Sequence, residues 1–239
     1  MTAVNYPWLP APADLTLLQN HVHVWRIDLD TTEAQLLSLT ETLSSDELSR
    51  AKRFYKEQHR QRFIAGRGIL RTILGQYLNI APQQLQFSYE PLGKPVLDDT
   101  INESKLWFNL THSQGLALCA VSCDRLVGVD LEYIRPVSDV LTLAKRYFCA
   151  REYETMRELP PHQMQQMFFR YWTCKEAYLK ATGVGLAQLE QIEVALTPTE
   201  GAKLITEQQW TLLELVPDEN AVAAVAVEGT DLQLSTWQY

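Results

Sequence analysis

Two carboxylates stand close together in a short segment that alternates as a β-strand does. In residues 127–134, VGVDLEYI, apolar side chains alternate with other residues, and Asp130 and Glu132 fill two of the positions between them. Side chains at positions i and i+2 of a strand point to the same face, so both carboxylates should project from one side. Because two like charges repel each other at that distance, the pattern indicates a cation that holds them together.

A third carboxylate lies in a segment with the features of a half-buried helix. Residues 168–186, FFRYWTCKEAYLKATGVGL, place Glu176 and Lys180 one helical turn apart on the same face. Alone, such a pair is typical of a solvated helix surface. Together with Asp130 and Glu132, however, Glu176 completes a set of oxygen ligands of the kind that Mg²⁺ prefers. The sequence therefore predicts a divalent metal site made of these three carboxylates, which would also accept Mn²⁺.

Magnesium usually binds substrate phosphates as well as protein oxygens, so cationic and hydroxyl donors are expected nearby. The segment 90–97, EPLGKPVL, presents a lysine in a turn, and the segment 108–115, FNLTHSQG, is typical of a strand that ends in a cluster of donors. Arginines of an early helical segment could bind phosphate through two hydrogen bonds each. Every one of these groups also fits an ordinary surface role. The candidates are Arg53, Arg60, Arg62, Arg67, Lys94, Thr111, His112 and Ser113.

The familiar nucleotide-binding and hydrolase motifs are absent from the sequence. It contains no G-x-x-x-x-G-K-[ST] loop, no G-x-G-x-x-G turn and no G-x-S-x-G elbow. Phosphate binding would therefore rest on the metal site and on individual cationic side chains, and a serine-hydrolase mechanism is not indicated.

The remaining segments supply elements that could position these groups. Residues 21–29, HVHVWRIDL, alternate as a strand, on which His21 and His23 share a face. The two histidines fit either a surface pair or a pair of metal ligands. Residues 44–54, SSDELSRAKRF, have the serine and acidic residues of a helix start, and residues 59–78 continue as a second helical stretch.

A faint internal repeat indicates how these segments are arranged. A strand, a long helical stretch and two further strands occur twice in the same order, with similar offsets: 102 positions separate Asp28 from Asp130, and 108 separate Gly75 from Gly183. We therefore expect an α+β fold of two similar pseudo-duplicated halves with a ligand cleft between them. The expected halves are residues 1–125 and residues 126–239.

The composition fits a soluble globular protein. The chain has 239 residues, of which 46% are hydrophobic, and a net charge of −8, which argues against general nucleic-acid binding. Its four cysteines form no C-x-x-C pair, so neither a zinc site nor a disulfide framework is expected, and reduced thiols favour the cytoplasm. The N-terminus does not have the pattern of a signal peptide, and no apolar run approaches the ~20 residues of a membrane span.

Two separated stretches together carry a bipartite signature. VGVD at 127–130 is followed, after a spacer of 41 residues, by WTCKEAYLK at 172–180. This arrangement resembles the pattern (V/I)-G-(V/I)-D … (F/W)-(S/C/T)-x-K-E-(A/S)-x-x-K of the 4′-phosphopantetheinyl transferases. GKP at 93–95 and FNLTHS at 108–113 resemble two further motifs of that family, and the length and duplication resemble its surfactin-synthetase-activator (Sfp) type. Thr111 departs from the family's usual serine but keeps the hydroxyl.

The resemblance implies a reaction and a set of roles. The phosphopantetheine arm of coenzyme A would pass to a serine of an apo carrier protein, which gives the holo carrier and adenosine 3′,5′-bisphosphate. Glu176, directly or through a metal-bound water, would be the general base for the serine, and Lys180 would neutralise or protonate the leaving phosphate. The residues expected to hold coenzyme A are an early arginine (Arg53 or Arg62), Lys94, Thr111, His112, Asp130, Lys175 and Lys180.

The resemblance also implies a protein partner. Acyl and peptidyl carrier proteins of fatty-acid, polyketide and peptide synthases are small acidic helical bundles, so a chain of charge −8 must recognise them locally. Residues 141–153, LTLAKRYFCAREY, offer such a place, although their apolar side could equally pack inward. We expect a monomer. The alternatives left open are a carrier-binding module without activity and a magnesium-dependent nucleotide phosphohydrolase. The residues of the proposed docking segment are Lys145, Arg146 and Arg151 with Leu141, Leu143, Tyr147 and Phe148.

Overall fold

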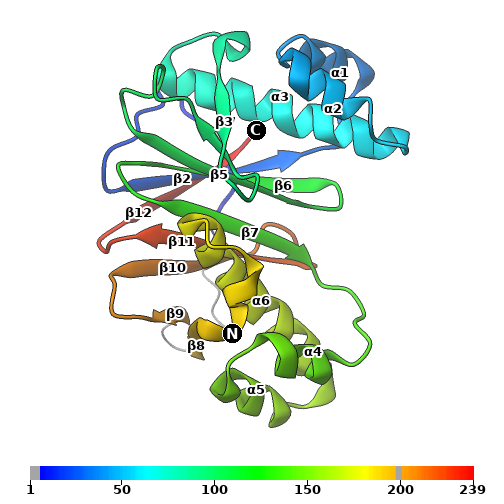
Figure 1. Ribbon diagram of the computed structural model, residues 1–239, viewed down its shortest axis with the longest axis vertical. Helices are drawn as coiled ribbons and strands as arrows, with labels where there is room; N and C mark the ends of the chain where they lie inside the picture. Colours follow the sequence, from blue (N-terminus) through cyan, green and yellow to red (C-terminus); the bar gives the residue numbers. More distant parts are fainter. Residues whose placement is uncertain (1–5, 198–200) are drawn as a thin grey trace.

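Helices cover the outer faces of two β-sheets in the computed structural model, which describes residues 6–197 and 201–239 (Figure 1). The helices are α1 (Glu33–Thr40), α2 (Ser45–Ala51), α3 (Glu57–Leu78), α4 (Val140–Tyr147), α5 (Ala150–Arg157) and α6 (Pro161–Thr182), with the short 3₁₀ turns η1 (Pro82–Gln84) and η2 (Leu186–Gln191). The strands are β1 (Leu9–Pro10), β2 (His21–Asp28), β3 (Phe87–Tyr89), β4 (Pro95–Leu97), β5 (Leu106–Ser113), β6 (Leu116–Cys123), β7 (Val127–Tyr133), β8 (Glu193–Thr197), β9 (Gly201–Ile205), β10 (Trp210–Leu215), β11 (Ala221–Glu228) and β12 (Gln233–Gln238).

The same unit is built twice. Each copy begins with a strand, continues through helices that end in one of 22 residues, and then forms a short hairpin and two antiparallel strands. In both sheets the strand order is first, last, middle: β2-β6-β5 in one copy and β7-β11-β10 in the other. The long helices, the hairpin strands and the paired strands of the two copies begin 104 to 106 positions apart. The expected α+β fold of two similar halves is therefore confirmed.

One strand crosses from the second copy to the first. β12, the last strand of the chain, pairs in parallel with β2, and β1 pairs in parallel with β12. The larger sheet therefore has the order β1-β12-β2-β6-β5. Because both ends of the described chain join this one sheet, residues 233–238 belong structurally with the first copy even though they follow the second in sequence.

The layers are helix, sheet, sheet and helix. One apolar cluster fills the space between α3 and the first sheet, and another lies between α6 and the second sheet. A third cluster lies between the sheets, where Val22 and Val24 of β2 meet Val127, Val129 and Leu131 of β7. These β7 residues are the apolar set that alternates with the acids, so the opposite face of β7 turns toward α6.

Local sequence signals explain several element boundaries. Ser44 caps α2: its amide donates to Glu47 Oε2 at 3.0 Å, which is one arm of a capping box. α6 ends where Gly183 takes the left-handed conformation with φ 72°, which glycine adopts readily. α6 begins at Pro161, earlier than the pattern indicates, since proline is favoured in the first turn of a helix.

The two histidines of β2 correct an expectation. His23 is 2% exposed, and its Nδ1 lies 2.8 Å from Tyr77 Oη, which also accepts a hydrogen bond from Trp25 Nε1 at 2.9 Å. His23 is therefore neither part of a surface pair nor placed to bind a metal with His21. It is a core residue, because the helix α3 covers this face of β2. None of the described helices is long and apolar enough to cross a membrane.

Candidate active site

The helix α6 lies directly on the strand β7, and one glycine permits this contact. A Cβ added at Gly128 would come within 2.1 Å of Ala177 O and 2.4 Å of Ala181 N, so any side chain there would collide with the helix backbone. Gly128 lies on the same face of the strand as its acids. The close approach therefore brings Glu176 and Lys180 of α6 over the acids of β7.

Asp130 is the centre of the resulting ionic cluster. Its side chain is 6% exposed, and its Oδ1 accepts hydrogen bonds from Lys180 Nζ at 2.5 Å and from Thr111 Oγ1 at 3.2 Å. Lys180 Nζ also donates to Thr111 Oγ1 at 3.1 Å. Burial raises the pKa of Asp130, which the charge of Lys180 opposes. Asp130 Oδ2 is buried and has no hydrogen-bond partner within the part of the chain that the structure describes.

Side chains of β5 hold β7 in place across the boundary between the sheets. Asn109 Oδ1 accepts a hydrogen bond from Val129 N at 2.9 Å, and Ser113 Oγ donates to Glu132 Oε2 at 3.1 Å. The bond between Thr111 and Asp130 lies between these two. The two strands belong to different sheets. Alternate residues of the FNLTHS motif therefore form a ladder of side chains that orients both acids.

Glu176 occupies a partly desolvated position beside this cluster. Its side chain is 13% exposed, and Lys180 Nζ lies 3.8 Å from Glu176 Oε2. Burial, followed by the charges of Asp130 and Glu132, raises the pKa of Glu176 to about 7, whereas Lys180 opposes the rise. Glu176 can therefore gain and lose a proton near neutral pH.

The three carboxylates fit a divalent cation, although protein cations occupy two of them. Among residues 6–197 and 201–239, no three His, Cys, Asp or Glu side chains already surround one point as ligands. Lys180 takes Asp130 Oδ1, and Arg135 Nη1 lies 2.8 Å from Glu132 Oε2. The unpartnered Oδ2 of Asp130 and the hard-oxygen chemistry of the set nevertheless suit Mg²⁺ or Mn²⁺. Such an ion would replace the ammonium and the guanidinium.

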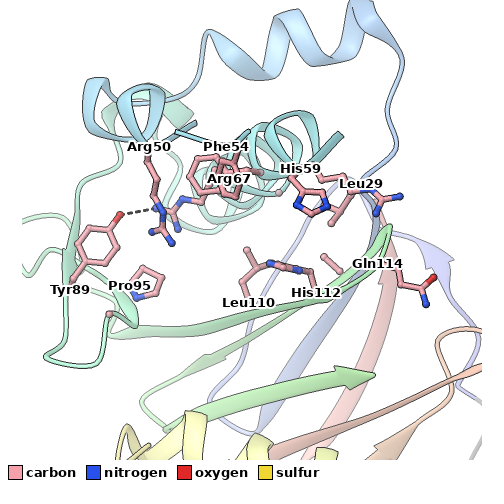
Figure 2. A pocket seen from close by; sticks show the side chains of 15 residues that line it. Leu29, Arg50, Phe54, His59, Arg67, Tyr89, Pro95, Leu110, His112 and Gln114 are labelled. Carbon is pink, nitrogen blue, oxygen red and sulfur yellow. Dashed lines mark hydrogen bonds between the residues drawn. The ribbon is translucent and has the colours of Figure 1, made fainter. Parts of the chain in front are cut away.

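An amphipathic pocket of about 410 Å³ opens beside the acids, between α2, α3, β5 and the β3–β4 turn (Figure 2). Part of its lining is apolar and part is cationic. The apolar residues are Leu29, Phe54, Phe63, Pro95, Leu110 and Ala117. The groups that carry or can carry positive charge are Arg50, His59, Arg62, Arg67 and His112. Such a lining suits a ligand with an aromatic ring and a phosphate.

The pocket arginines differ in whether a carboxylate already neutralises them. Arg62 is held by Asp30 through two bonds of 2.7 Å. Arg50, in contrast, has no carboxylate partner among the described residues and lies with its Cζ 5.3 Å from the Phe63 ring centroid. In Figure 2 Arg50 lies at the same end of the pocket as Tyr89, and the dashed line to Tyr89 comes from Arg67. Arg53 lies outside this pocket and lines a neighbouring hollow that shares Arg50.

His112 links the pocket to the acids. Its ring lines the pocket, and burial, then the charges of Lys180 and Arg62, lowers the pKa of His112, which Glu132 partly opposes. The preceding residue, Thr111, points from the opposite face of β5 toward Asp130. The structure therefore joins Thr111, Asp130 and Lys180 by hydrogen bonds, and it places His112 where the charges of Lys180 and Glu132 act on its ring.

Lys94 lies where the two halves meet. Its Nζ donates to Ala181 O at 3.3 Å, at the carboxyl end of α6, and burial lowers the pKa of Lys94. The turn that carries Lys94 also contributes Gly93 and Pro95 to the pocket wall. Lys94 therefore lies between the pocket and the end of α6. Its partner Ala181 directly follows Lys180 in the sequence.

Two family models match the two halves of the chain. Residues 28–124 match the N-terminal part of 4′-phosphopantetheinyl transferase, and residues 126–226 match the 4′-phosphopantetheinyl transferase superfamily. The 4′-phosphopantetheinyl transferase HetI of Nostoc sp. (strain PCC 7120) is 62% identical over 99% of this chain and 100% of its own length. The chain belongs to the 4′-phosphopantetheinyl transferase superfamily.

Two further proteins are less similar to this chain. A putative 4′-phosphopantetheinyl transferase, slr0495 of Synechocystis sp. (strain PCC 6803), is 42% identical over 61% of this chain and 58% of its own length. A crystal structure of a holo-(acyl-carrier-protein) synthase from Bacillus anthracis in complex with CoA (3′,5′-ADP) has a TM-score of 0.39 and 22% identity, and covers 44% of this chain and 96% of the other.

One residue of the transferase motif does not lie where the resemblance implies. Lys175 was expected to contact coenzyme A, but it is 0% exposed, and its Nζ lies 2.5 Å from Glu152 Oε2 on α5. It also stacks over the Phe148 ring, 4.9 Å from the centroid. Since Lys175 and Glu176 are adjacent on α6, one turns toward the core while the other turns toward the cleft. The expectation that Lys175 contacts coenzyme A is therefore wrong, and Lys175 has a structural role in the core.

The segment expected to dock a carrier protein is only partly exposed. Lys145 and Arg146 of α4 are exposed, whereas Leu141, Leu143 and Tyr147 are half-buried against the core between α6 and the second sheet. Phe148 is 4% exposed and stacks on Phe168, so it is not available as an anchor. Arg151 lies on α5, where its Nη1 is 3.2 Å from Glu193 Oε1.

The sequence alone does not single out several pocket residues of this transferase. Arg50, His59 and Gln114 line the pocket but were not among the phosphate-binding candidates that the sequence indicates. Arg50 precedes Arg53 by three residues in the sequence, but Arg53 lies beyond the end of α2, so the two do not share a helix face. No local pattern indicates His59 or Gln114, which reach the pocket through the packing of α3 on β5.

Proposed function

We propose that this chain transfers the 4′-phosphopantetheine arm of coenzyme A to a serine of an apo acyl or peptidyl carrier protein. The observation that carries the proposal is the placement of the ionic cluster of Asp130, Glu176 and Lys180 beside a pocket with cationic and apolar walls. The cluster suits a diphosphate, and the pocket suits the adenosine end of the same molecule. The family membership supports the same reaction.

Asp130, Glu132 and Glu176 would hold a Mg²⁺ or Mn²⁺ ion, for which Asp130 Oδ2 is the oxygen that lacks a partner among the described residues. The bound ion supplies charge neutralisation to the diphosphate of coenzyme A. Ser113 orients Glu132 for this role through its 3.1 Å hydrogen bond. Such a partner fixes the direction of a ligand carboxylate.

The chemical step breaks one bond to phosphorus and forms another. The serine oxygen of the carrier attacks the phosphorus that bears pantetheine, and the bond between that phosphorus and the bridging oxygen breaks, which releases adenosine 3′,5′-bisphosphate. Glu176 would take the serine proton, directly or through a water molecule. Such a base typically contributes about 10²- to 10⁴-fold in rate.

Lys180 would stabilise the leaving phosphate. In this structure its ammonium pairs with Asp130, and its side chain is 29% exposed, so it can turn toward a ligand in the cleft. Positioning and charge neutralisation are the main contributions that a protein makes to phosphoryl transfer. Lys180 is therefore assigned a catalytic role together with Glu176.

The pocket would hold the 3′-phosphate and adenine end of coenzyme A. We assign the 3′-phosphate to Arg50 and His112, with Lys94 and Thr111 toward the diphosphate. Arg50 is preferred to Arg62 because Asp30 already neutralises Arg62, and to Arg53 because Arg53 lies in the adjoining hollow. Charge-assisted bonds to phosphate are stronger than neutral ones.

The carrier protein would dock on the second half, with Lys145 and Arg146 at the edge of the contact. Both side chains are exposed on α4, and the half-buried Tyr147 follows them. Because the two repeats of one chain enclose the cleft, no second copy is needed, which favours a monomer. The four cysteines are free thiols, which is compatible with the cytoplasm.

Release of adenosine 3′,5′-bisphosphate tests the proposal. The protein is mixed with coenzyme A and Mg²⁺, with and without an apo carrier protein, and the nucleotide is measured by chromatography. Nucleotide that appears only with the carrier supports transfer. Release without a carrier would indicate a phosphohydrolase, and no release in either mixture would indicate a binding module without activity.

A further inference from the structure

A buried carboxylate outside the motifs ties the walls of the nucleotide pocket together. Glu47, in the first turn of α2, is 2% exposed. Its Oε1 accepts a hydrogen bond from Arg67 Nε and its Oε2 one from Arg71 Nε, both at 2.6 Å. Burial works against its ionised form, but Arg67, the Ser44 amide and Arg71 outweigh it, so the pKa of Glu47 is lowered. Glu47 is therefore an ionised residue that compensates two guanidinium groups.

Each guanidinium leads to a different wall. Arg67 lines the pocket, and its Nη2 lies 3.4 Å from Tyr89 Oη on β3 (Figure 2). Arg71 donates to the carbonyl oxygens of Pro82 and Leu85 at 3.0 and 2.9 Å, in the segment that leads to β3. Glu47 itself lies on α2, which contributes Arg50 to the pocket. One carboxylate therefore joins α2, α3 and the hairpin wall.

The ring of Phe87 completes this arrangement. The Cζ atoms of Arg67 and Arg71 lie 4.7 and 5.1 Å from its centroid, so both guanidiniums lie close to one aromatic ring. The carboxylate of Glu47 separates their charges. Without it, two like charges would share this buried space, and the repulsion would push the more exposed group, Arg67, out of the pocket wall.

The internal repeat provides a counterpart of this carboxylate. Glu152 stands 105 positions after Glu47, also in the first turn of its helix, and accepts a bond from Lys175, which stands 104 positions after Arg71. Glu152 also accepts hydrogen bonds from Cys149 N at 3.0 Å and Val194 N at 2.7 Å. The counterpart therefore joins the short and long helices of its half in the same way, but its partner Lys175 is the residue before Glu176 on α6, and Glu152 does not line the pocket.

We propose that Glu47 is a positioning residue for the nucleotide end of coenzyme A, acting through Arg67 and Arg71. This inference rests on the proposed function and names the residue that shapes its pocket. The two carboxylates therefore have different roles. Glu47 holds the residues that form the pocket of the first half in place, and Glu152 fixes the orientation of α6 in the second half. Loss of Glu47 should therefore affect binding, and loss of Glu152 should affect turnover.

Glu47→Gln and the matched Glu152→Gln are compared with the wild type. The dissociation constant of adenosine 3′,5′-bisphosphate is measured by calorimetry, and KM for coenzyme A and kcat are measured in the transfer reaction. For Glu47→Gln we expect the dissociation constant and KM to rise at least about fivefold, because a misplaced binding group lowers affinity by this much or more. We expect kcat to stay within about twofold of the wild-type value. For Glu152→Gln we expect a lower kcat and an unchanged dissociation constant.

A general loss of stability must be distinguished from positioning, so thermal unfolding is followed for each variant. If Glu47→Gln does not fold, Glu47→Asp keeps the charge but withdraws the carboxylate, and the same rise in the dissociation constant is expected. Wild-type or tighter nucleotide binding by the folded Glu47 variant would overturn the inference, as would equal weakening by both Gln variants. Failure of the wild type itself to bind the nucleotide would instead reject the proposed function.

Discussion

The ammonium of Lys180 lies 2.5 Å from Asp130 Oδ1, and both groups lie next to Thr111. This contact joins the catalytic helix to the acidic strand and to the strand that lines the pocket. In the proposed reaction the two groups have different partners, because Asp130 would hold the metal ion and Lys180 the leaving phosphate. We therefore expect the two groups to separate when coenzyme A and the metal ion bind.

Asp130→Asn should abolish transfer and leave the fold intact. Loss of the metal ligand removes several kcal/mol of charge stabilisation from the transition state, so we expect transfer to fall by more than about 100-fold. The thermal midpoint should be unchanged or higher, because burial opposes the charge of Asp130. Mn²⁺ binding, followed by electron paramagnetic resonance, should be weakened as well. Glu33→Gln, an exposed change on α1, is the control, and transfer at the wild-type rate by a folded Asp130→Asn protein would refute the assignment.

Coenzyme A should bind more tightly than dephospho-coenzyme A. A charge-assisted contact to the 3′-phosphate is worth ~1.5–3 kcal/mol, so KM should differ by at least about tenfold. The difference should shrink in Arg50→Gln and in His112→Gln, the two groups assigned to the 3′-phosphate, and should persist in Lys94→Ala. Arg60→Gln is the matched control, because Arg60 pairs with Glu57 and does not line the pocket. Equal KM values for the two compounds in the wild type would show that the pocket does not read the 3′-phosphate.

Reversal of two charges on α4 should weaken docking of the carrier protein. Lys145→Glu combined with Arg146→Glu should raise KM for an acidic carrier and flatten its salt dependence, because exposed charges at the edge of an interface mainly change the association rate. KM for coenzyme A should change little. The control is the double variant Lys105→Glu and Lys203→Glu, because both residues are exposed and neither lies on α4. Unchanged carrier kinetics in the α4 double mutant would place the docking surface elsewhere.

Acidification should destabilise the first half through His23. Burial, and then the charge of His21, lowers the pKa of His23 from 6.5 to about 4. The unfolded state therefore takes up a proton below pH 6.5 while the folded state does not, so stability present above pH 6.5 is lost as the pH falls toward 4. The loss from this group is at most about 3 kcal/mol. His23→Gln should flatten the pH dependence of the free energy of unfolding in urea, whereas the exposed His162→Gln should not. A His23→Gln protein with the wild-type pH profile would contradict this explanation.

The acids of the site could be predicted because each lies on an element with a regular period. Asp130 and Glu132 share a strand face, and Glu176 and Lys180 share a helix face, whatever the rest of the chain does. Their mutual distances could not be predicted, since they depend on how closely α6 approaches β7. That approach is set by Gly128, whose role is visible only when the helix backbone is in place.

Burial was the harder property to read from the sequence. Lys175 and Glu176 are adjacent charged residues, and periodicity does not decide which of them faces the core. Lys175 can be buried because Glu152, 23 residues earlier, compensates its charge. The same holds for Arg62, a phosphate candidate in the sequence that Asp30 neutralises, 32 residues away. Charge partners at such separations leave no local pattern.

The central claim is that this chain adds phosphopantetheine to a carrier protein, and the intact mass of the carrier tests it most directly. An apo carrier protein is incubated with coenzyme A, Mg²⁺ and this protein, and its mass is measured before and after. We predict a gain equal to one phosphopantetheine group, which disappears when the acceptor serine of the carrier is replaced by alanine or when EDTA removes the metal. An unchanged mass across a panel of apo acyl and peptidyl carriers, with the protein folded and coenzyme A bound, would contradict the claim.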